Sequence, residues 1–232
     1  MKNLLYVGPS WAVRDFNSTD TQLTNSLQST YTNIKKECNL KVTDLSEYGA
    51  SNFDMLDKIK SHSGYDGIVW VYCEPIHDLE LLNICSKQEF LTSPDFWNMR
   101  ALANKHTLDE MNNLNIPIGL IGSHSDIFDC NHRNLTIIHD SWQLFLIDSI
   151  NYDYVDVGRG FQGWGADVAH RWMAQYRINP SKEITDKITD TFFLWSLLIE
   201  KDLFWEVHPS RKGNELFSKK INKPLHLWID KL

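Results

Sequence analysis

Two residues near opposite ends of the 232-residue chain, Ser10 and His208, are of the types that perform nucleophilic catalysis. Ser10 follows a short apolar run, Asn3–Val7, and the turn Gly8-Pro9, which would hold its hydroxyl at the edge of a sheet. His208 precedes Pro209, and a residue before proline is restricted to extended backbone. A serine becomes a nucleophile when a base removes its proton, and that base is most often histidine. Taken singly, such a serine is more often a turn residue and such a histidine a structural one.

The elements that would bring the two residues together follow from the hydrophobic pattern. Continuous apolar runs with β-branched residues are typical of strands buried on both faces. Five such runs predict strands over Asn3–Val7, Leu40–Leu45, Gly67–Cys73, Ile116–Ile121 and Leu135–His139. The polar amphipathic stretches predict helices over Thr21–Glu37, Phe53–Ser61, Phe96–Leu114, Ala166–Tyr176, Glu183–Lys201 and Lys212–Ile221.

Strands that alternate with helices predict an α/β fold, a three-layer α/β/α sandwich around a five-stranded parallel sheet. Ligands of such sheets bind outside the carboxyl ends of the strands, which is where Ser10 falls. The chain has no internal repeat, low-complexity tract or break in composition, so we expect one domain over residues 1–232.

Composition excludes several classes of protein. A hydrophobic content of 42% is too high for a disordered chain, and a net charge of −7 argues against a nucleic-acid partner. No apolar run reaches the ~18–20 residues of a membrane helix, so no membrane partner is expected. The four cysteines, at positions 38, 73, 85 and 130, have neither a disulfide framework nor zinc-site spacing. The first apolar run is too short for a signal peptide, which leads us to expect a cytoplasmic protein.

Three short blocks, in order along nearly the whole chain, resemble those of the SGNH (GDSL-type) hydrolases. Gly8-Pro9-Ser10 resembles the Gly-Asp-Ser block that opens the family, and it lies at the end of the first predicted strand. Residues 44–52 resemble the second block, a strand followed by a glycine, here Gly49. His208-Pro209, followed by Gly213 at the start of the last predicted helix, resembles the final block. The resemblance implies the flavodoxin-like form of the α/β sandwich.

The resemblance implies a serine esterase that forms an acyl-Ser10 intermediate with His208 as base. The oxyanion would be bound by backbone N–H groups of Ser10 and Gly49 and by the side chain at position 74. No metal or cofactor is required. The expected substrate is a small-molecule or carbohydrate ester with a small acyl group; the family's tendency favours acetyl. Residues placed to contact substrate are Trp11, Asn52 and Trp205.

Departures from the family pattern leave a second function open. Pro9 replaces the aspartate of the first block, and Glu74 stands where the family has an oxyanion-binding asparagine. Trp205 stands where the acid that orients the histidine is expected, three residues before His208. Glu206 is the nearest carboxylate and our preferred orienting group; Asp202 is an alternative, as is a Ser-His dyad. The alternative function is a catalytically degenerate domain that binds a glycan or a protein.

A glycine-rich segment, Gly158–Gly163, spells G-x-G-x-x-G and raises a third possibility, a nucleotide-binding or transferase domain. A dinucleotide fingerprint follows an early strand, whereas this segment lies late and precedes two predicted helices. A connecting loop is the commoner role, and a loop over the site would offer Arg159, Phe161 and Trp164 to substrate. Residues Ser123–Asp126 contain all three triad types, but adjacent side chains point in different directions.

Overall fold

A computed structural model describes residues 2–9, 12, 41–73, 78, 87–123, 127, 130–150, 166–205 and 208–232. Five parallel strands form its main sheet in the order β2-β1-β3-β4-β5. The strands are β1 (Asn3–Val7), β2 (Lys41–Asp44), β3 (Gly67–Tyr72), β4 (Ile118–Gly122) and β5 (Leu135–His139). This order is that of flavodoxin-like sheets. The predicted α/β class and five-stranded parallel sheet are therefore confirmed.

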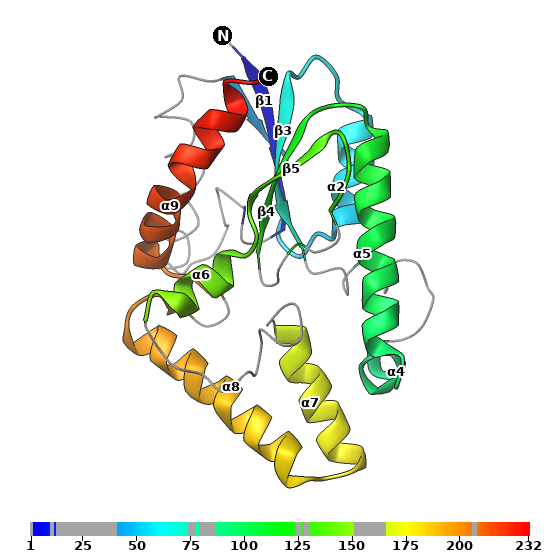
Figure 1. Ribbon diagram of the computed structural model, residues 1–232, viewed down its shortest axis with the longest axis vertical. Coiled ribbons are helices and arrows are strands. Elements are labelled where there is room, and N and C mark those ends of the chain that lie inside the picture. The colour runs from blue at the N-terminus through cyan, green and yellow to red at the C-terminus, as the bar shows by residue number, and fades with distance from the viewer. Residues whose placement is uncertain are drawn as a thin grey trace.

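Helices cover both faces of the sheet (Figure 1). One face carries α2 (Asn52–Lys60) and α5 (Phe96–Asn113), and the other carries α6 (Trp142–Asp148) and α9 (Arg211–Ile229). Alternate residues of a strand point to opposite faces, so each strand contributes to two cores. In β1, Leu4 and Tyr6 pack in the core beneath α6 and α9, while Leu5 and Val7 pack in the core beneath α2 and α5.

Most predicted elements lie within two residues of the observed ones. Ile116 and Pro117 precede β4 rather than belonging to it. Pro117 has no N–H for the ladder, although its carbonyl accepts a hydrogen bond of 3.0 Å from Ile68. The predicted helix over Thr21–Glu37 lies outside the described residues. The short helices α4 (Lys87–Thr92) and α6 were not predicted, because six or seven residues give too little periodicity.

The prediction that the last helix ends at Ile221 is wrong, because α9 continues to Ile229 and passes through Pro224. A proline inside a helix removes one hydrogen bond and costs about 3 kcal/mol. The apolar face of α9 offsets that cost, since Leu225 and Trp228 are buried against the sheet. Gly119 of β4 lets the Trp228 ring lie directly on the strand, because a Cβ there would be 3.1 Å from the indole.

Two further helices, α7 (Ala166–Ile178) and α8 (Lys182–Glu200), lie beyond the carboxyl end of the sheet (Figure 1). Arg171 attaches α7 to the end of α4 and to the residue that follows it. Its guanidinium donates to the carbonyls of Leu91 and Ser93, each at 3.0 Å, and lies 4.3 Å from the centre of the Phe96 ring. In the described part of the chain, no helix is long and apolar enough to cross a membrane.

A small antiparallel hairpin of β6 (Phe204–Trp205) and β7 (His208–Pro209) leads into α9. Ser210 caps α9 and connects it to the preceding turn, since its backbone N–H donates to Leu203 and its hydroxyl to the carbonyl of Asp202. Gly213, in the first turn of α9, lies against the same turn. A Cβ at position 213 would be 2.2 Å from the carbonyl oxygen of Leu203. The glycine is what allows α9 to begin so close to the hairpin.

We expect Gly213→Ala to lower the free energy of unfolding by about 1–3 kcal/mol, because the added methyl group forces the first turn of α9 away from Leu203. The direction of this change in stability is informative, since alanine ordinarily stabilises a helix relative to glycine by about 1 kcal/mol. Urea denaturation measures the change, and Lys219→Ala, on the exposed side of the same helix, is the control. A Gly213→Ala protein as stable as this control would contradict the packing argument.

Candidate active site

The turn after β1 and the loop after β2 meet at the carboxyl edge of the sheet. The backbone N–H of Glu47 donates to the carbonyl of Gly8 at 3.0 Å, and that of Leu45 donates to Tyr6 at 2.9 Å. The N–H of Ala12 donates to the carbonyl of Pro9 at 2.8 Å. Ser10 and Trp11 themselves lie outside the described residues.

Gly8 occupies a position that no larger residue could fill. A Cβ on Gly8 would lie 2.7 Å from the Cβ of Val71, and 2.8 Å from both the Val71 carbonyl oxygen and the Cβ of Ala12. Gly8, directly after β1, therefore lies tightly against Val71 of the neighbouring strand β3. This close approach gives the glycine of the first block a packing reason that is separate from any catalytic one.

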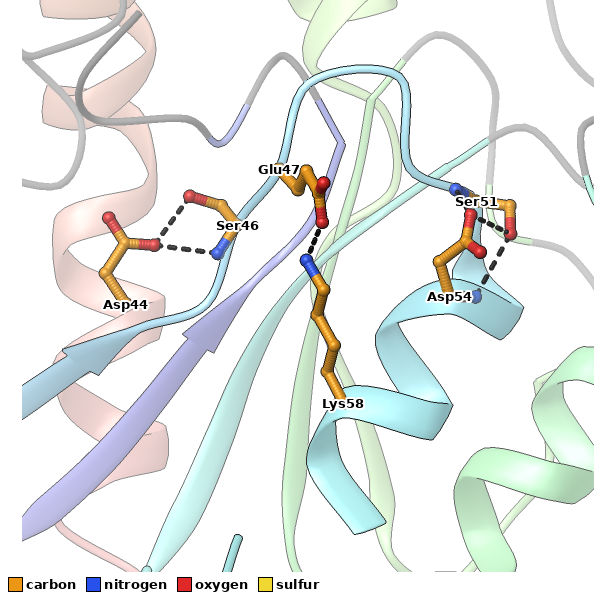
Figure 2. A network of polar contacts seen from close by, with 6 residues as sticks. All are labelled: Asp44, Ser46, Glu47, Ser51, Asp54 and Lys58. Carbon is orange, nitrogen blue, oxygen red and sulfur yellow. Dashed lines mark hydrogen bonds and ion pairs between the residues drawn. The ribbon is translucent and has the colours of Figure 1, made fainter. Parts of the chain in front are cut away.

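Side chains of the loop that carries Gly49 and of the helix α2 hold this loop in place (Figure 2). At its start, the Asp44 carboxylate accepts hydrogen bonds from the backbone N–H and hydroxyl of Ser46, at 2.9 and 2.5 Å. At its end, Ser51 and Asp54 form a capping box at the beginning of α2. In between, Glu47 forms an ion pair with Lys58 of α2.

Gly49 lies at the exposed turn of this loop, with φ of +72°. That backbone conformation is strained for residues with a Cβ and is ordinary for glycine. A Cβ at Gly49 would have no described atom within 4 Å. Backbone conformation, and not crowding, is therefore the reason for a glycine at position 49.

His208 lies in β7 and is 6% exposed. Its ring centre is 6.2 Å from that of Tyr48, the residue directly before Gly49. Burial lowers the pKa of His208 from 6.5 to about 4, since the charged imidazolium loses its hydration. At neutral pH the ring is therefore uncharged, the form in which an imidazole accepts a proton.

The structure thus brings two of the predicted site residues, Gly49 and His208, to the same end of the sheet, connected through Tyr48. Glu74 and Glu206 lie outside the described residues, as do the glycine-rich segment and residues 124–126. Trp205 belongs to β6, and its side chain is likewise outside the description. The backbone carbonyl of Asp202 accepts a hydrogen bond from the hydroxyl of Ser210, the residue directly after the hairpin. The predicted catalytic and substrate-contacting roles of these residues stay predictions.

Asn52 lies at the same edge but is fully buried, at 0% exposed. Its amide oxygen accepts from the backbone N–H of Cys73 at 3.0 Å and from the indole of Trp70 at 3.2 Å. Its amide nitrogen donates to the carbonyl of Cys73 at 3.1 Å and to the carboxylate of Asp78 at 2.9 Å. These four bonds use the full capacity of a primary amide.

Asp78 is a buried acid that belongs to none of the motifs, and it too is 0% exposed. Besides Asn52, its carboxylate accepts from the Thr107 hydroxyl at 3.0 Å and from the backbone N–H of Phe53 at 3.2 Å. Burial raises the pKa of Asp78 from 3.8 to about 6, and these hydrogen bonds limit the rise. An aspartate shortly after a strand is typical of a turn, so nothing in the sequence distinguished it.

A separate cavity of about 430 Å³ lies at the end of β5, lined by His139, Asp140, Ser141, Leu144, Phe145, Asp148 and Lys220. His139 packs against the rings of Phe145 and Phe217, and burial lowers its pKa. Within the described ranges, no group of three or more His, Cys, Asp or Glu side chains is arranged to hold a metal ion.

Comparison with known proteins adds a structural likeness. The chain matches no protein-family model and no curated protein sequence. Among solved structures it is similar to that of protein YxiM from Bacillus subtilis, with a TM-score of 0.42 and 13% sequence identity. The match covers 97% of this chain and 56% of YxiM, so the chain spans little more than half the length of that protein.

We expect the imidazole of His208 to titrate near pH 4 in the folded protein, well below its ordinary pKa of 6.5. Because the unfolded chain takes up the proton more readily, the stability contributed by neutral His208 is complete above pH 6.5. It is lost as the pH falls toward 4, and amounts to about 3 kcal/mol. Histidine ring NMR measures the titration, with His208→Gln to assign the resonance. A midpoint near 6.5 would contradict the buried, uncharged ring.

Proposed function

We propose that the protein is a serine esterase of SGNH type that hydrolyses a small acyl ester through an acyl-Ser10 intermediate. The observation that supports this most is the position of His208. Its buried, uncharged imidazole lies beside Tyr48, and Tyr48 belongs to the loop that carries Gly49. Glu47 of the same loop donates a backbone hydrogen bond to Gly8, which is two residues before Ser10. The three blocks of the family resemblance extend over about 200 residues of sequence, from Gly8 to His208, and their described parts meet at one edge.

In the proposed reaction, the Ser10 hydroxyl attacks the ester carbonyl while the imidazole of His208 takes the hydroxyl proton. Collapse of the tetrahedral intermediate breaks the bond to the alcohol oxygen, and the imidazolium returns the proton to the departing alcohol. Water then attacks the acyl-serine in the same way, releasing the carboxylic acid and restoring Ser10. A low pKa for His208 keeps the base uncharged over the neutral range.

The oxyanion would be stabilised by backbone N–H groups of Ser10 and Gly49. The exposed turn at Gly49 leaves its backbone open to a bound substrate. A well-placed donor of this kind is worth about 3–4 kcal/mol in the transition state. Glu74, the third member of the proposed oxyanion site, would have to be protonated there, because an ionised carboxylate would repel the oxyanion.

The site would take its substrate from the side of Tyr48. Tyr48 is 57% exposed although its ring lies near that of His208, so it offers an aromatic surface beside the proposed base. Aromatic rings pack well against the apolar faces of sugars and other rings. We therefore propose Tyr48 as a contact for the alcohol part of the ester, together with the predicted contacts Trp11 and Trp205. Glu206 remains our proposed orienting acid for His208.

We expect p-nitrophenyl acetate turnover to fall at least a thousandfold in both Ser10→Ala and His208→Ala, because nucleophile and base act as a unit. Steady-state kinetics checks this, and His62→Ala, which alters an exposed histidine at the end of α2, is the control. Turnover by the wild type that survives either substitution would contradict the assignment. A wild type that binds esters or glycans without turnover would instead support the degenerate binding domain.

We expect Glu74→Gln to retain or exceed wild-type turnover, with the gain largest at high pH. A glutamine amide can donate to the oxyanion at every pH, whereas glutamate can do so only when protonated. The pH dependence of kcat/KM measures the difference, and Glu215→Gln on the exposed side of α9 is the control. Loss of activity in a folded Glu74→Gln protein would remove Glu74 from the proposed oxyanion site.

A further inference from the structure

The side chain of Asn52 pairs with the backbone directly after the last residue of β3. Its amide exchanges two hydrogen bonds with the backbone of Cys73, donating to the carbonyl at 3.1 Å and accepting from the N–H at 3.0 Å. A side-chain amide that pairs in this way takes the place of a neighbouring strand. Since Asn52 is the first residue of α2, the pairing joins the beginning of that helix to the carboxyl end of β3.

Asp78 holds Asn52 in that orientation. One carboxylate oxygen accepts from the Asn52 amide at 2.9 Å and from the Thr107 hydroxyl at 3.0 Å, and the other accepts from the Phe53 N–H at 3.2 Å. All three partners are donors, so the ionised carboxylate satisfies each of them. The N–H of Phe53 belongs to the first turn of α2, which has no acceptor within the helix and favours a negative charge.

Among the described residues, the hydrogen-bond partners of the Asp78 carboxylate are all neutral. Of the charged or titratable residues on α2 and α5 near this end, Asp54 is bonded to Ser51 and His106 packs against the ring of Phe53. Arg100, on α5, is buried at 1% exposed. None of the three donates to the Asp78 carboxylate. Burial of a carboxylate is costly, and the raised pKa of Asp78 reflects that cost.

We propose that Asn52 and Asp78 form a positioning pair that fixes the Gly49 loop against the carboxyl end of β3 and thereby places the Gly49 N–H for the oxyanion. This inference rests on the esterase activity proposed above. Gly49 lies three residues before Asn52, and Ser51 between them caps the helix that the pair anchors. A shift of α2 relative to Cys73 would move the oxyanion donor away from the acyl-serine, and small displacements of such donors cost much of the rate.

Asp78→Asn tests the pair with little change in volume. An asparagine has one acceptor oxygen, so it cannot accept from both sides of the former carboxylate, and one buried donor loses its partner. We expect kcat for p-nitrophenyl acetate to fall about tenfold or more, with KM nearly unchanged, because oxyanion stabilisation acts in the transition state. Asp57→Asn, which alters an exposed acid on α2, is the matched control and should leave kcat unchanged.

The pH profile separates positioning from general stability. In the wild type, protonation of Asp78 near pH 6 should lower kcat, while protonation of His208 acts near pH 4. The Asp78→Asn protein should lack the step near pH 6 and keep the one near pH 4. Because the folded pKa of Asp78 lies above its ordinary value, ionisation lowers stability as the pH rises from about 4 through 6. Asp78→Asn removes this loss of stability, because asparagine does not ionise. An Asp78→Asn protein that is stably folded at pH 8 but has a low kcat therefore supports the positioning role of Asp78.

Hydrogen exchange gives a readout that does not depend on catalysis. In Asp78→Asn, the amides of Phe53 and Cys73 should exchange faster than in Asp57→Asn, since both are held by the pair. Unchanged exchange would overturn the pair itself. Faster exchange with unchanged kcat would overturn its positioning role and leave the esterase proposal intact. Faster exchange in a protein whose wild type hydrolyses no ester would overturn the esterase proposal, and with it the role of the pair in catalysis.

Discussion

β1 pairs with β2 on one side and with β3 on the other, and this central position decides where the rest of the molecule can do chemistry. Parallel pairing of Tyr6 with Asp44 and of Val7 with Trp70 makes the three strands end within a few residues of one another. The segments that follow them therefore share one edge. Gly8 strengthens this arrangement, because only a glycine lets the end of β1 lie on Val71 without displacing β3.

The same edge receives His208 from a part of the chain that contributes nothing to the main sheet. The β6–β7 hairpin is only two residues long on each side, so its position depends on what packs around it. Gly213 allows α9 to begin against the hairpin, and Ser210 connects the two through hydrogen bonds. α9 is in turn held on the sheet by Phe217, Leu225 and Trp228. Burial of the imidazole follows from this packing, and the uncharged state of the ring at neutral pH follows from the burial.

Much of the fold could be predicted from the sequence, because the strands are continuous apolar runs and the long helices are strongly periodic. The extension of α9 past Pro224 could not, since the buried contacts of Trp228 outweigh a local helix breaker. Among the candidate site residues, Gly49 and His208 were found through short motifs. The pairing of Asn52 with Asp78 could not be found in that way, because it depends on contacts between residues 26 positions apart. In sequence alone, both residues resemble ordinary cap and turn residues.

We propose that Ser10 is a nucleophile activated by His208. The most direct test is to treat the protein with a fluorophosphonate, which reacts covalently with activated serines, and to locate the adduct by peptide mass spectrometry. The account requires a single adduct on Ser10 that forms in the wild type and is absent from His208→Ala. An adduct on a different serine, or none at all in a folded and otherwise intact protein, would contradict it.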